Sequence, residues 1–233
     1  MSSHSSGPVL QLLASGLQRW IRSQCDSVED LNLSLQGSAF ALLKGRLKGV
    51  TLQAKHVQFQ QLPLVRAELQ SGELKASLRP GQPTQPVQFE EPFLVSGEVV
   101  LSGVELNQAL ASDRWRWLGD LLSEQLMGLT PLRSLTIDND ILKLTADVIT
   151  GKDPVRRSFR LYAEQGTIRV DHCDAEGGML IPMDPAIQIE EVRLKAGQLV
   201  LKGTAKILCF FFDVKPTLFD VALISTQVHS ISS

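Results

Sequence analysis

One tight-turn pattern recurs along this chain, and it constrains the fold more than any other feature. Each copy has an apolar residue, a spacer, a two-residue turn, a second spacer and another apolar residue. The copies are Leu69–Leu74, Ile137–Leu142, Ala163–Ile168 and Leu194–Leu199. Gly or Asp stands second in every turn, where a two-residue β-hairpin requires a positive φ. These segments are therefore predicted to be hairpins.

The apolar residues on the two sides of each turn are arranged symmetrically, which predicts how the strands pair. Leu69 would pair with Leu74, and Ile137 with Leu142. A hairpin in this register places all its apolar side chains on one face. The sequence therefore predicts a long antiparallel sheet with one apolar face. The further pairs expected are Ala67 with Ala76, Val65 with Leu78, and Leu135 with Leu144.

The N-terminal segment predicts an amphipathic helix over residues 8–25. Its apolar residues Val9, Leu13 and Leu17 recur at helical steps, and Pro8 suits the first turn. Polar residues interrupt the stretch, so it is too short and too polar to cross a bilayer, and it makes a poor signal peptide. We expect this helix to pack on the sheet.

Helical periodicity returns in the middle of the chain, at Leu106–Leu110 and again at Leu118–Leu126. The order of helix, strands, helices and strands indicates an α+β fold of two similar halves. We expect one domain over residues 1–207, with halves at about 1–104 and 105–207, followed by a C-terminal extension at 208–233.

Composition excludes some classes of partner and compartment. The chain has 233 residues, of which 43% are hydrophobic, so it is long enough to bury a sizeable core. A net charge of −2 gives no electrostatic reason to expect nucleic acid. Its three cysteines are scattered and odd in number, which favours a reducing compartment. With no export leader expected, these features predict a cytoplasmic location.

The predicted sheet has more apolar surface than the predicted helices can cover. About ten strands with one apolar face are expected, against one N-terminal helix and one helical segment in mid-chain. Each Leu or Val left in water would forgo about 1.5–3 kcal/mol, whereas a domain is stable by only about 5–15 kcal/mol. The sheet could curl around the helix, a second copy could dock, or an apolar ligand could cover the face.

Several short segments carry a distinctive spacing of Gly, Leu and Asn. They are Leu43–Gly49 with Val50, Val57, Phe59 and Leu62, then Glu105–Ser112, and finally Leu201–Ala205. Together they resemble the LmeA-like phospholipid-binding family of bacteria, although Glu105 stands where Asp is usual. The resemblance implies a fold similar to tubular lipid-binding proteins, in which a strongly curved sheet wraps a long helix with lipid chains between them. Some members carry an N-terminal membrane anchor, which we do not expect here.

The leading hypothesis is a protein that binds phospholipid or another acyl-chain lipid without catalysis. The lipid would lie in a trough between the helix at 8–25 and the apolar face of the hairpins, and each acyl methylene removed from water would contribute about 0.8 kcal/mol. Ordinary core packing is the alternative for each residue taken singly. The candidate lining residues are Leu13, Leu17, Val50, Leu52, Leu69, Leu74, Leu142 and Leu144.

A separate hypothesis concerns peripheral contact with the cytoplasmic face of a membrane. Arg114, Trp115, Arg116 and Trp117 alternate cations with indole rings, a combination favoured at the interface between water and bilayer. The alternative is a helix start with one Trp buried and the Arg side chains exposed.

The rival to lipid binding is a structural or interaction module whose apolar face is covered by a homodimer partner. The C-terminal segment favours it, because Phe210, Phe211, Phe212 and Phe219 cluster there. Such a segment could form an added edge strand, a dimer contact or a disordered extension.

Enzymatic activity has little support in the sequence. His172, Cys173 and Asp174 form the densest polar cluster, but neighbours on a strand point to opposite faces, which is poor for joint metal coordination. No nucleophile elbow or Gly-rich phosphate loop is present. We therefore predict a protein that is not an enzyme, with no metal and no cofactor.

Overall fold

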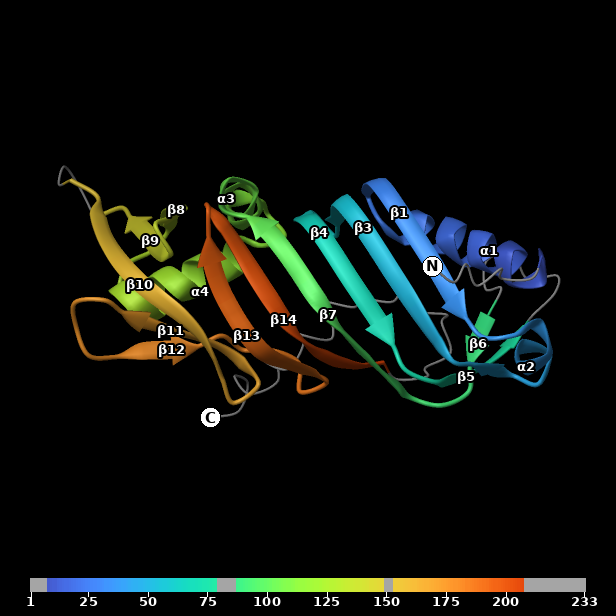
Figure 1. The fold of residues 1–233 in the computed structure, drawn as a ribbon. Coiled ribbons are helices and arrows are strands. Elements are labelled where there is room, and N and C mark those ends of the chain that lie inside the picture. The colour runs from blue at the N-terminus through green and yellow to red at the C-terminus, as the bar shows by residue number, and fades with distance from the viewer. Residues whose placement is uncertain (1–7, 79–86, 149–152, 208–233) are drawn as a thin grey trace, which may run out of the picture.

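The computed structural model describes residues 8–78, 87–148 and 153–207. The C-terminal phenylalanines and the predicted extension at 208–233 lie outside the described residues, as does Cys209. The described elements are helices and mostly antiparallel strands, which confirms the α+β class (Figure 1). A strongly curved, tubular sheet and the division into two halves stay predictions.

The elements follow the predicted order of helix, strands, helices and strands, except that a short helix, α2, interrupts the first group of strands. The helices are α1 (Pro8–Gln24), α2 (Ala39–Leu43), α3 (Gly103–Ala111) and α4 (Arg116–Met127). The strands are β1 (Ser27–Gln36), β2 (Arg46–Leu47), β3 (Gly49–Phe59), β4 (Leu62–Ser71), β5 (Leu74–Leu78), β6 (Val87–Phe89), β7 (Phe93–Ser102), β8 (Leu132–Asp138), β9 (Ile141–Ala146), β10 (Val155–Glu164), β11 (Thr167–His172), β12 (Gly178–Leu180), β13 (Ile187–Lys195) and β14 (Gln198–Ile207).

The strands form three sheets. The six-stranded sheet has the order β1-β3-β4-β7-β14-β13, the five-stranded sheet has β12-β11-β10-β9-β8, and a small sheet has β2-β5-β6. The five-stranded sheet adjoins the six-stranded one where β10 packs against β13. In Figure 1, β1 passes in front of α1 and β10 passes in front of α4, so both helices lie behind the strands.

Three of the predicted hairpins are confirmed in register and in turn geometry. Ile137 pairs with Leu142, Ala163 with Ile168, and Leu194 with Leu199. Both turn residues have positive φ in each case, for example 46° at Asn139 and 62° at Asp140. The turn chemistry identified these hairpins correctly because Gly, Asn and Asp tolerate that conformation better than other residues.

The predicted hairpin at Leu69–Leu74 is wrong. Strand β4 pairs with β3 and β7, whereas β5 pairs with β2 and β6, so none of the expected pairs from Val65–Leu78 to Leu69–Leu74 forms. Leu74 instead pairs with Leu47, and both side chains are buried together with those of α1. The alternating pattern was correct for each strand, but it could not specify which neighbour buries it.

The predicted N-terminal helix is confirmed as α1, and its apolar side meets the sheet. Leu10, Leu13 and Leu17 are buried, whereas Arg19 is exposed. The three buried leucines pack with Leu33 and other residues of β1, β2 and β5, and we call this group the N-terminal cluster. No described helix combines the length and apolar character that a membrane crossing requires. The cluster consists of Leu10, Leu13, Leu17, Leu33, Leu35, Leu42, Leu47, Leu74 and Ala76.

A second and larger cluster joins α3 and α4 to the five-stranded sheet and to part of the six-stranded one. Phe159 and Leu144, each 0% exposed, lie within it. Ile21 of α1 and Leu52 of β3 contact both clusters but are only partly buried. The border between the two clusters is thus less completely covered than either interior.

Candidate functional site

The six-stranded sheet carries a row of residues that pair across all its strands. Because directly paired residues point to the same face, the burial of Leu33 against α1 fixes the face on which the whole row lies. We call this the apolar face. The row runs through Leu33, Leu52, Leu69, Gly97, Gly203 and Ile189.

A second row lies beside it on the same face. It starts at Leu35, which pairs with Val50. The Val50 N–H donates to Ser71 Oγ at 3.0 Å, and Ser71 pairs with Val95. The row then continues through Ala205 and Ile187.

Exposure separates the β1 end of these rows from the remaining positions. Leu33 and Leu35 are buried at 7% and 4% exposure, whereas every further member of both rows is only partly buried. Helix α1 packs chiefly on β1, and α3 packs chiefly on β8 and less on β4 and β7, so neither helix packs chiefly on the strands that carry the partly buried positions. We call the partly buried apolar positions the central strip. They are Leu52, Leu69, Gly97, Gly203, Ile189, Val50, Val95, Ala205 and Ile187.

Two paired glycines occupy the middle of the central strip. Gly97 of β7 pairs with Gly203 of β14, so two neighbouring strands present bare backbone between Leu69 and Ile189. A Cβ at Gly97 would lie 2.1 Å from the Glu68 carbonyl oxygen, and one at Gly203 would lie 2.2 Å from that of Gln188. Glycine in a strand interior is typical of such close backbone approach.

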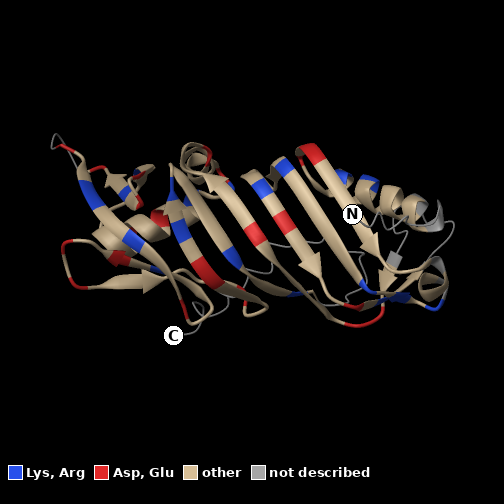
Figure 2. Ribbon diagram, in the orientation of Figure 1, with Lys and Arg blue, Asp and Glu red and all other residues tan. Residues whose placement is uncertain are grey.

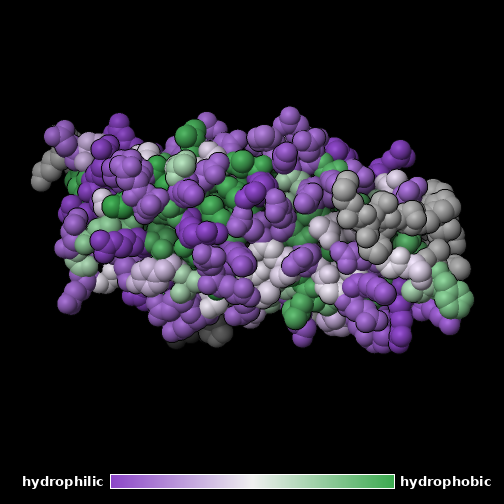
Figure 3. Space-filling model, viewed as in Figure 1, coloured by the Kyte–Doolittle hydropathy of each residue, from purple (hydrophilic) through white to green (hydrophobic). Residues whose placement is uncertain are grey.

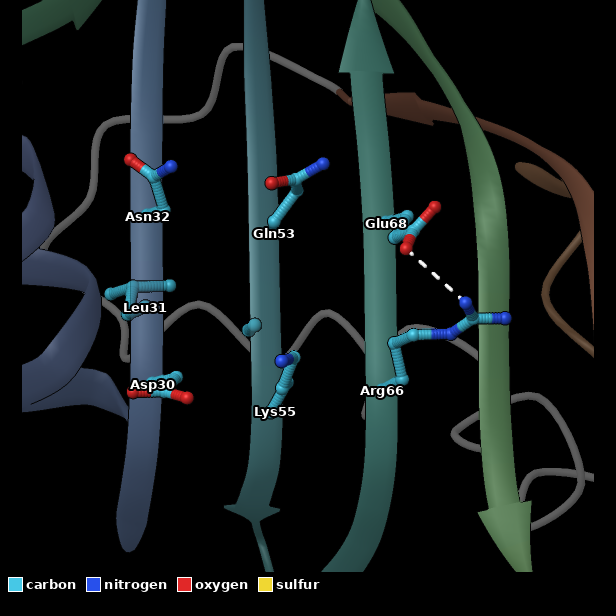
Figure 4. Close-up of a pocket in the computed structure, with 8 residues that line it drawn as sticks. Asp30, Leu31, Asn32, Gln53, Lys55, Arg66 and Glu68 are labelled. Carbon is cyan, nitrogen blue, oxygen red and sulfur yellow. Dashed lines mark hydrogen bonds and ion pairs between the residues drawn. The ribbon is translucent and has the colours of Figure 1, made fainter.

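The opposite face of the same sheet is polar. Figure 2 shows acidic and basic residues on neighbouring strands, and Arg66 bonds Glu98 at 2.6 Å while Arg193 approaches Glu98 at 3.4 Å. Figure 3 shows this side as mostly hydrophilic, with hydrophobic surface between the charged groups. A depression of about 310 Å³ lies here, and Asn32, Gln53 and Glu68 are among the side chains around it (Figure 4). Ionic and amide groups make it unsuitable for acyl chains.

Most of the chain matches a known protein family. Residues 6–204 match the family described as LmeA-like phospholipid-binding. The chain belongs to this family. Comparisons with curated proteins and with solved structures gave no match.

The residues predicted to line a trough in this LmeA-like chain fall into two groups. Six lie at or beside α1 and the central strip: Leu13, Leu17 and Leu74 are buried in the N-terminal cluster, whereas Val50, Leu52 and Leu69 are partly buried. The structure does not bring Leu142 and Leu144 to the same place, because both are buried in the larger cluster at 4% and 0% exposure.

The sequence did not identify the β7, β13 and β14 members of the strip, which are Val95, Gly97, Ile187, Ile189, Gly203 and Ala205. Glycines within alternating strands were the available signal, but the Gly97–Gly203 pairing joins segments far apart in the sequence.

Arg114 and Trp115, predicted as membrane contacts, hold a turn of the sheet in this LmeA-like protein. Gln60 and Gln61 connect β3 to β4 with positive φ at both residues, 51° and 63°, without the help of glycine. The Trp115 indole N–H donates to the Gln60 carbonyl at 2.9 Å, and the Arg114 guanidinium donates to the Gln60 side-chain oxygen. Asp26 accepts from the Gln61 N–H at 2.8 Å.

Burial divides the two tryptophans of this segment. Trp115 is 5% exposed and belongs to the larger cluster, whereas Trp117 is 39% exposed. The alternative interpretation, in which one Trp of this segment is buried, therefore fits Trp115, whose ring is not accessible to a membrane. Arg116 is exposed beside Trp117, and a membrane role for these two residues stays a prediction.

Titratable groups cluster on the five-stranded sheet, away from the central strip. Tyr162 O–H donates to Asp171, and the Arg169 guanidinium bonds Asp171 at 2.6 Å. The tyrosine hydrogen bond and then the guanidinium lower the pKa of Asp171, and the same hydrogen bond raises the pKa of Tyr162. Within the described ranges, no group of three His, Cys, Asp or Glu residues is placed to hold a metal ion.

The lowered pKa of Asp171 predicts a contribution to stability that acid removes. The contribution is present above the unfolded pKa, close to the ordinary value of 3.8, and is lost as the pH falls through the lower folded value. We expect Asp171→Asn to unfold at a lower urea concentration than the parent protein at neutral pH, and the gap between them to narrow in acid. A gap that is the same at both pH values would contradict this prediction.

Proposed function

We propose that this protein binds phospholipid or another acyl-chain lipid without catalysis, and that the acyl chains lie on the central strip. One observation carries the proposal: nine apolar or glycine positions, in register on one face, are only partly buried. Membership of a phospholipid-binding family supports the choice of ligand. The strip is uncharged, so the headgroup would remain towards solvent.

The dimensions and energetics of the strip suit an acyl chain. From β3 to β13 it crosses four strand spacings, roughly 19 Å in all. Each methylene removed from water contributes about 0.8 kcal/mol, so binding would not require strong headgroup contacts. The Gly97–Gly203 pair leaves the middle of the strip without side chains, which allows a chain to approach the backbone.

Lipid content provides the direct test. Protein purified from its own host should release phospholipid on organic extraction, and native mass spectrometry should show a matching added mass. The delipidated protein should then take up fluorescent phospholipid. Protein that carries no lipid and takes up none would refute the proposal.

A charge on the central strip should prevent uptake. Leu69 is partly buried on the apolar face, so Leu69→Glu places a carboxylate where the acyl chain would lie. Desolvating that carboxylate is costly, and we expect the affinity for labelled phospholipid to fall at least tenfold.

Gln70→Glu is the matched control for Leu69→Glu. Gln70 is the next residue of the same strand and is exposed. The Gln70→Glu substitution therefore adds the same charge on the polar face. Equal uptake by both variants, with unchanged circular dichroism, would exclude the strip as the lipid site. A lipid-free dimer that Leu69→Glu converts to a monomer would instead identify the strip as a homodimer interface.

A further inference from the structure

The end of the molecule formed by α2 and β2 combines an exposed aromatic ring with cations. Helix α2 begins after Ser38, whose side chain accepts from the Ala41 N–H at 3.1 Å. The inner side of this end is buried in the N-terminal cluster. Leu42 of α2 is 2% exposed there, and Leu47 of β2 is 1% exposed. On the outer side, Phe40 is 67% exposed.

One cation lies over this ring, and two more are exposed on the segment that follows. The Lys44 ammonium lies 4.3 Å from the centroid of Phe40, and Arg46 and Lys48 are exposed on the segment that follows. Within the described part of the chain these cations form no ion pair. We call Phe40, Lys44, Arg46 and Lys48 the basic tip, and Figure 2 shows basic residues at this end, at the lower right.

Acidic groups are also present near this end, but they lie on other elements. Glu91 is bonded to Lys75 at 2.5 Å. The Glu90 carboxylate lies close to Gly45, since a Cβ there would be 3.9 Å from it. The Phe40 ring, however, has the Lys44 ammonium beside it, and α2 itself carries no acidic residue.

We propose that the basic tip docks on the surface of an anionic bilayer. An exposed aromatic ring with ammonium and guanidinium groups on the same segment matches that surface, because the ring can enter the acyl boundary while the cations meet lipid phosphates. A nucleic acid would use the cations but would leave the isolated exposed Phe40 without an apolar partner.

The position of the tip connects docking to lipid binding. Leu42 of α2 packs in the same cluster as Leu10 and Leu13 of α1, and the central strip begins at the edge of that cluster with Val50 and Leu52. Docking at the tip would place this edge near the bilayer from which lipid is taken. The link between docking and lipid uptake rests on the proposed function, whereas attachment to vesicles is a separate property.

Co-sedimentation with vesicles tests the docking. The probes are vesicles of phosphatidylcholine alone and of phosphatidylcholine with phosphatidylglycerol. The intact protein should bind the anionic vesicles, and binding should weaken with salt. Reversing the tip charges (Lys44→Glu, Arg46→Glu, Lys48→Glu) should reduce affinity at least tenfold, and Phe40→Ser severalfold.

The matched control reverses three exposed cations on β10 (Arg156→Glu, Arg157→Glu, Arg160→Glu). Strand β10 belongs to the five-stranded sheet, away from the tip. We expect the three substitutions to change the affinity for vesicles by no more than about twofold. Docking at the tip is overturned if the intact protein ignores anionic vesicles, if the tip variants sediment like it, or if the β10 variant loses as much binding. The single Phe40→Ser variant keeps the test valid should the triple reversal unfold the protein.

Uptake from detergent micelles separates docking from the proposed function. Tip variants should still take up labelled phospholipid supplied in micelles, because the central strip is intact. A protein that binds vesicles through the tip but takes up no lipid would uphold docking and refute only the lipid-binding proposal. A tip variant that keeps its fold but loses uptake from micelles would overturn the assignment of the tip as a docking surface alone.

Discussion

Replacing Gly97 with alanine should lower the free energy of unfolding by about 3 kcal/mol. The added Cβ would lie 2.1 Å from the Glu68 carbonyl oxygen and 2.9 Å from the Leu69 Cα, and both belong to the backbone of the neighbouring strand. Backbone atoms cannot rotate away as a side chain can, so β4 and β7 would have to separate. Urea denaturation followed by circular dichroism measures the change.

Two other glycines provide controls with the same chemical change. At Gly72 and Gly16 an added Cβ would meet nothing within 4 Å. Gly16 lies inside α1, where alanine should stabilise the protein by about 0.5–1 kcal/mol. All three variants alter the unfolded chain alike, so the difference between them isolates the contact with β4. If Gly97→Ala and Gly72→Ala unfold at the same urea concentration, the close approach at Gly97 does not exist.

Turn chemistry allowed the sequence to predict three hairpins correctly, and its limits explain two errors. Gly, Asn or Asp marks the turns at Asn139, Gly166 and Gly197, where positive φ is required. The β3–β4 turn uses Gln60 and Gln61 instead, so no local pattern identified it. Distant residues compensate, because Trp115, Arg114 and Asp26 bond to this turn.

The Ser71-Gly72 turn shows the opposite error. Its sequence suits a hairpin, but the chain leaves the six-stranded sheet after β4, and β5 pairs with β2 and packs in the N-terminal cluster. Burying Leu74 and Ala76, at 4% and 0% exposure, outweighs a local turn preference. Alternation specifies the face on which a side chain lies, and tertiary packing selects the neighbour.

The same distinction applies to the candidate site. Alternation correctly placed Val50, Leu52 and Leu69 on an apolar face, but it also selected Leu142 and Leu144, which are buried in the larger cluster. Which parts of an apolar face remain open depends on where the helices pack, and helix amphipathicity alone does not contain that information.

Trp115→Ala should be the most damaging single substitution in the segment predicted to contact membranes. It removes a side chain that is 5% exposed in the larger cluster, and such losses cost about 3–5 kcal/mol. It also leaves the Gln60 carbonyl without its indole donor in a turn of unfavourable φ. Trp115→Phe keeps most of the bulk and isolates the hydrogen bond, so its cost should be intermediate. Urea denaturation gives both values.

Trp117→Ala separates burial from membrane contact. Trp117 is 39% exposed, so its loss should change the free energy of unfolding by no more than about 0.5 kcal/mol. If only the basic tip docks, this variant should also sediment with anionic vesicles like the parent protein. A loss of sedimentation as large as that of Phe40→Ser would instead place Trp117 and Arg116 at the bilayer, and equal destabilisation by Trp115→Ala and Trp117→Ala would show that Trp115 is not a core residue.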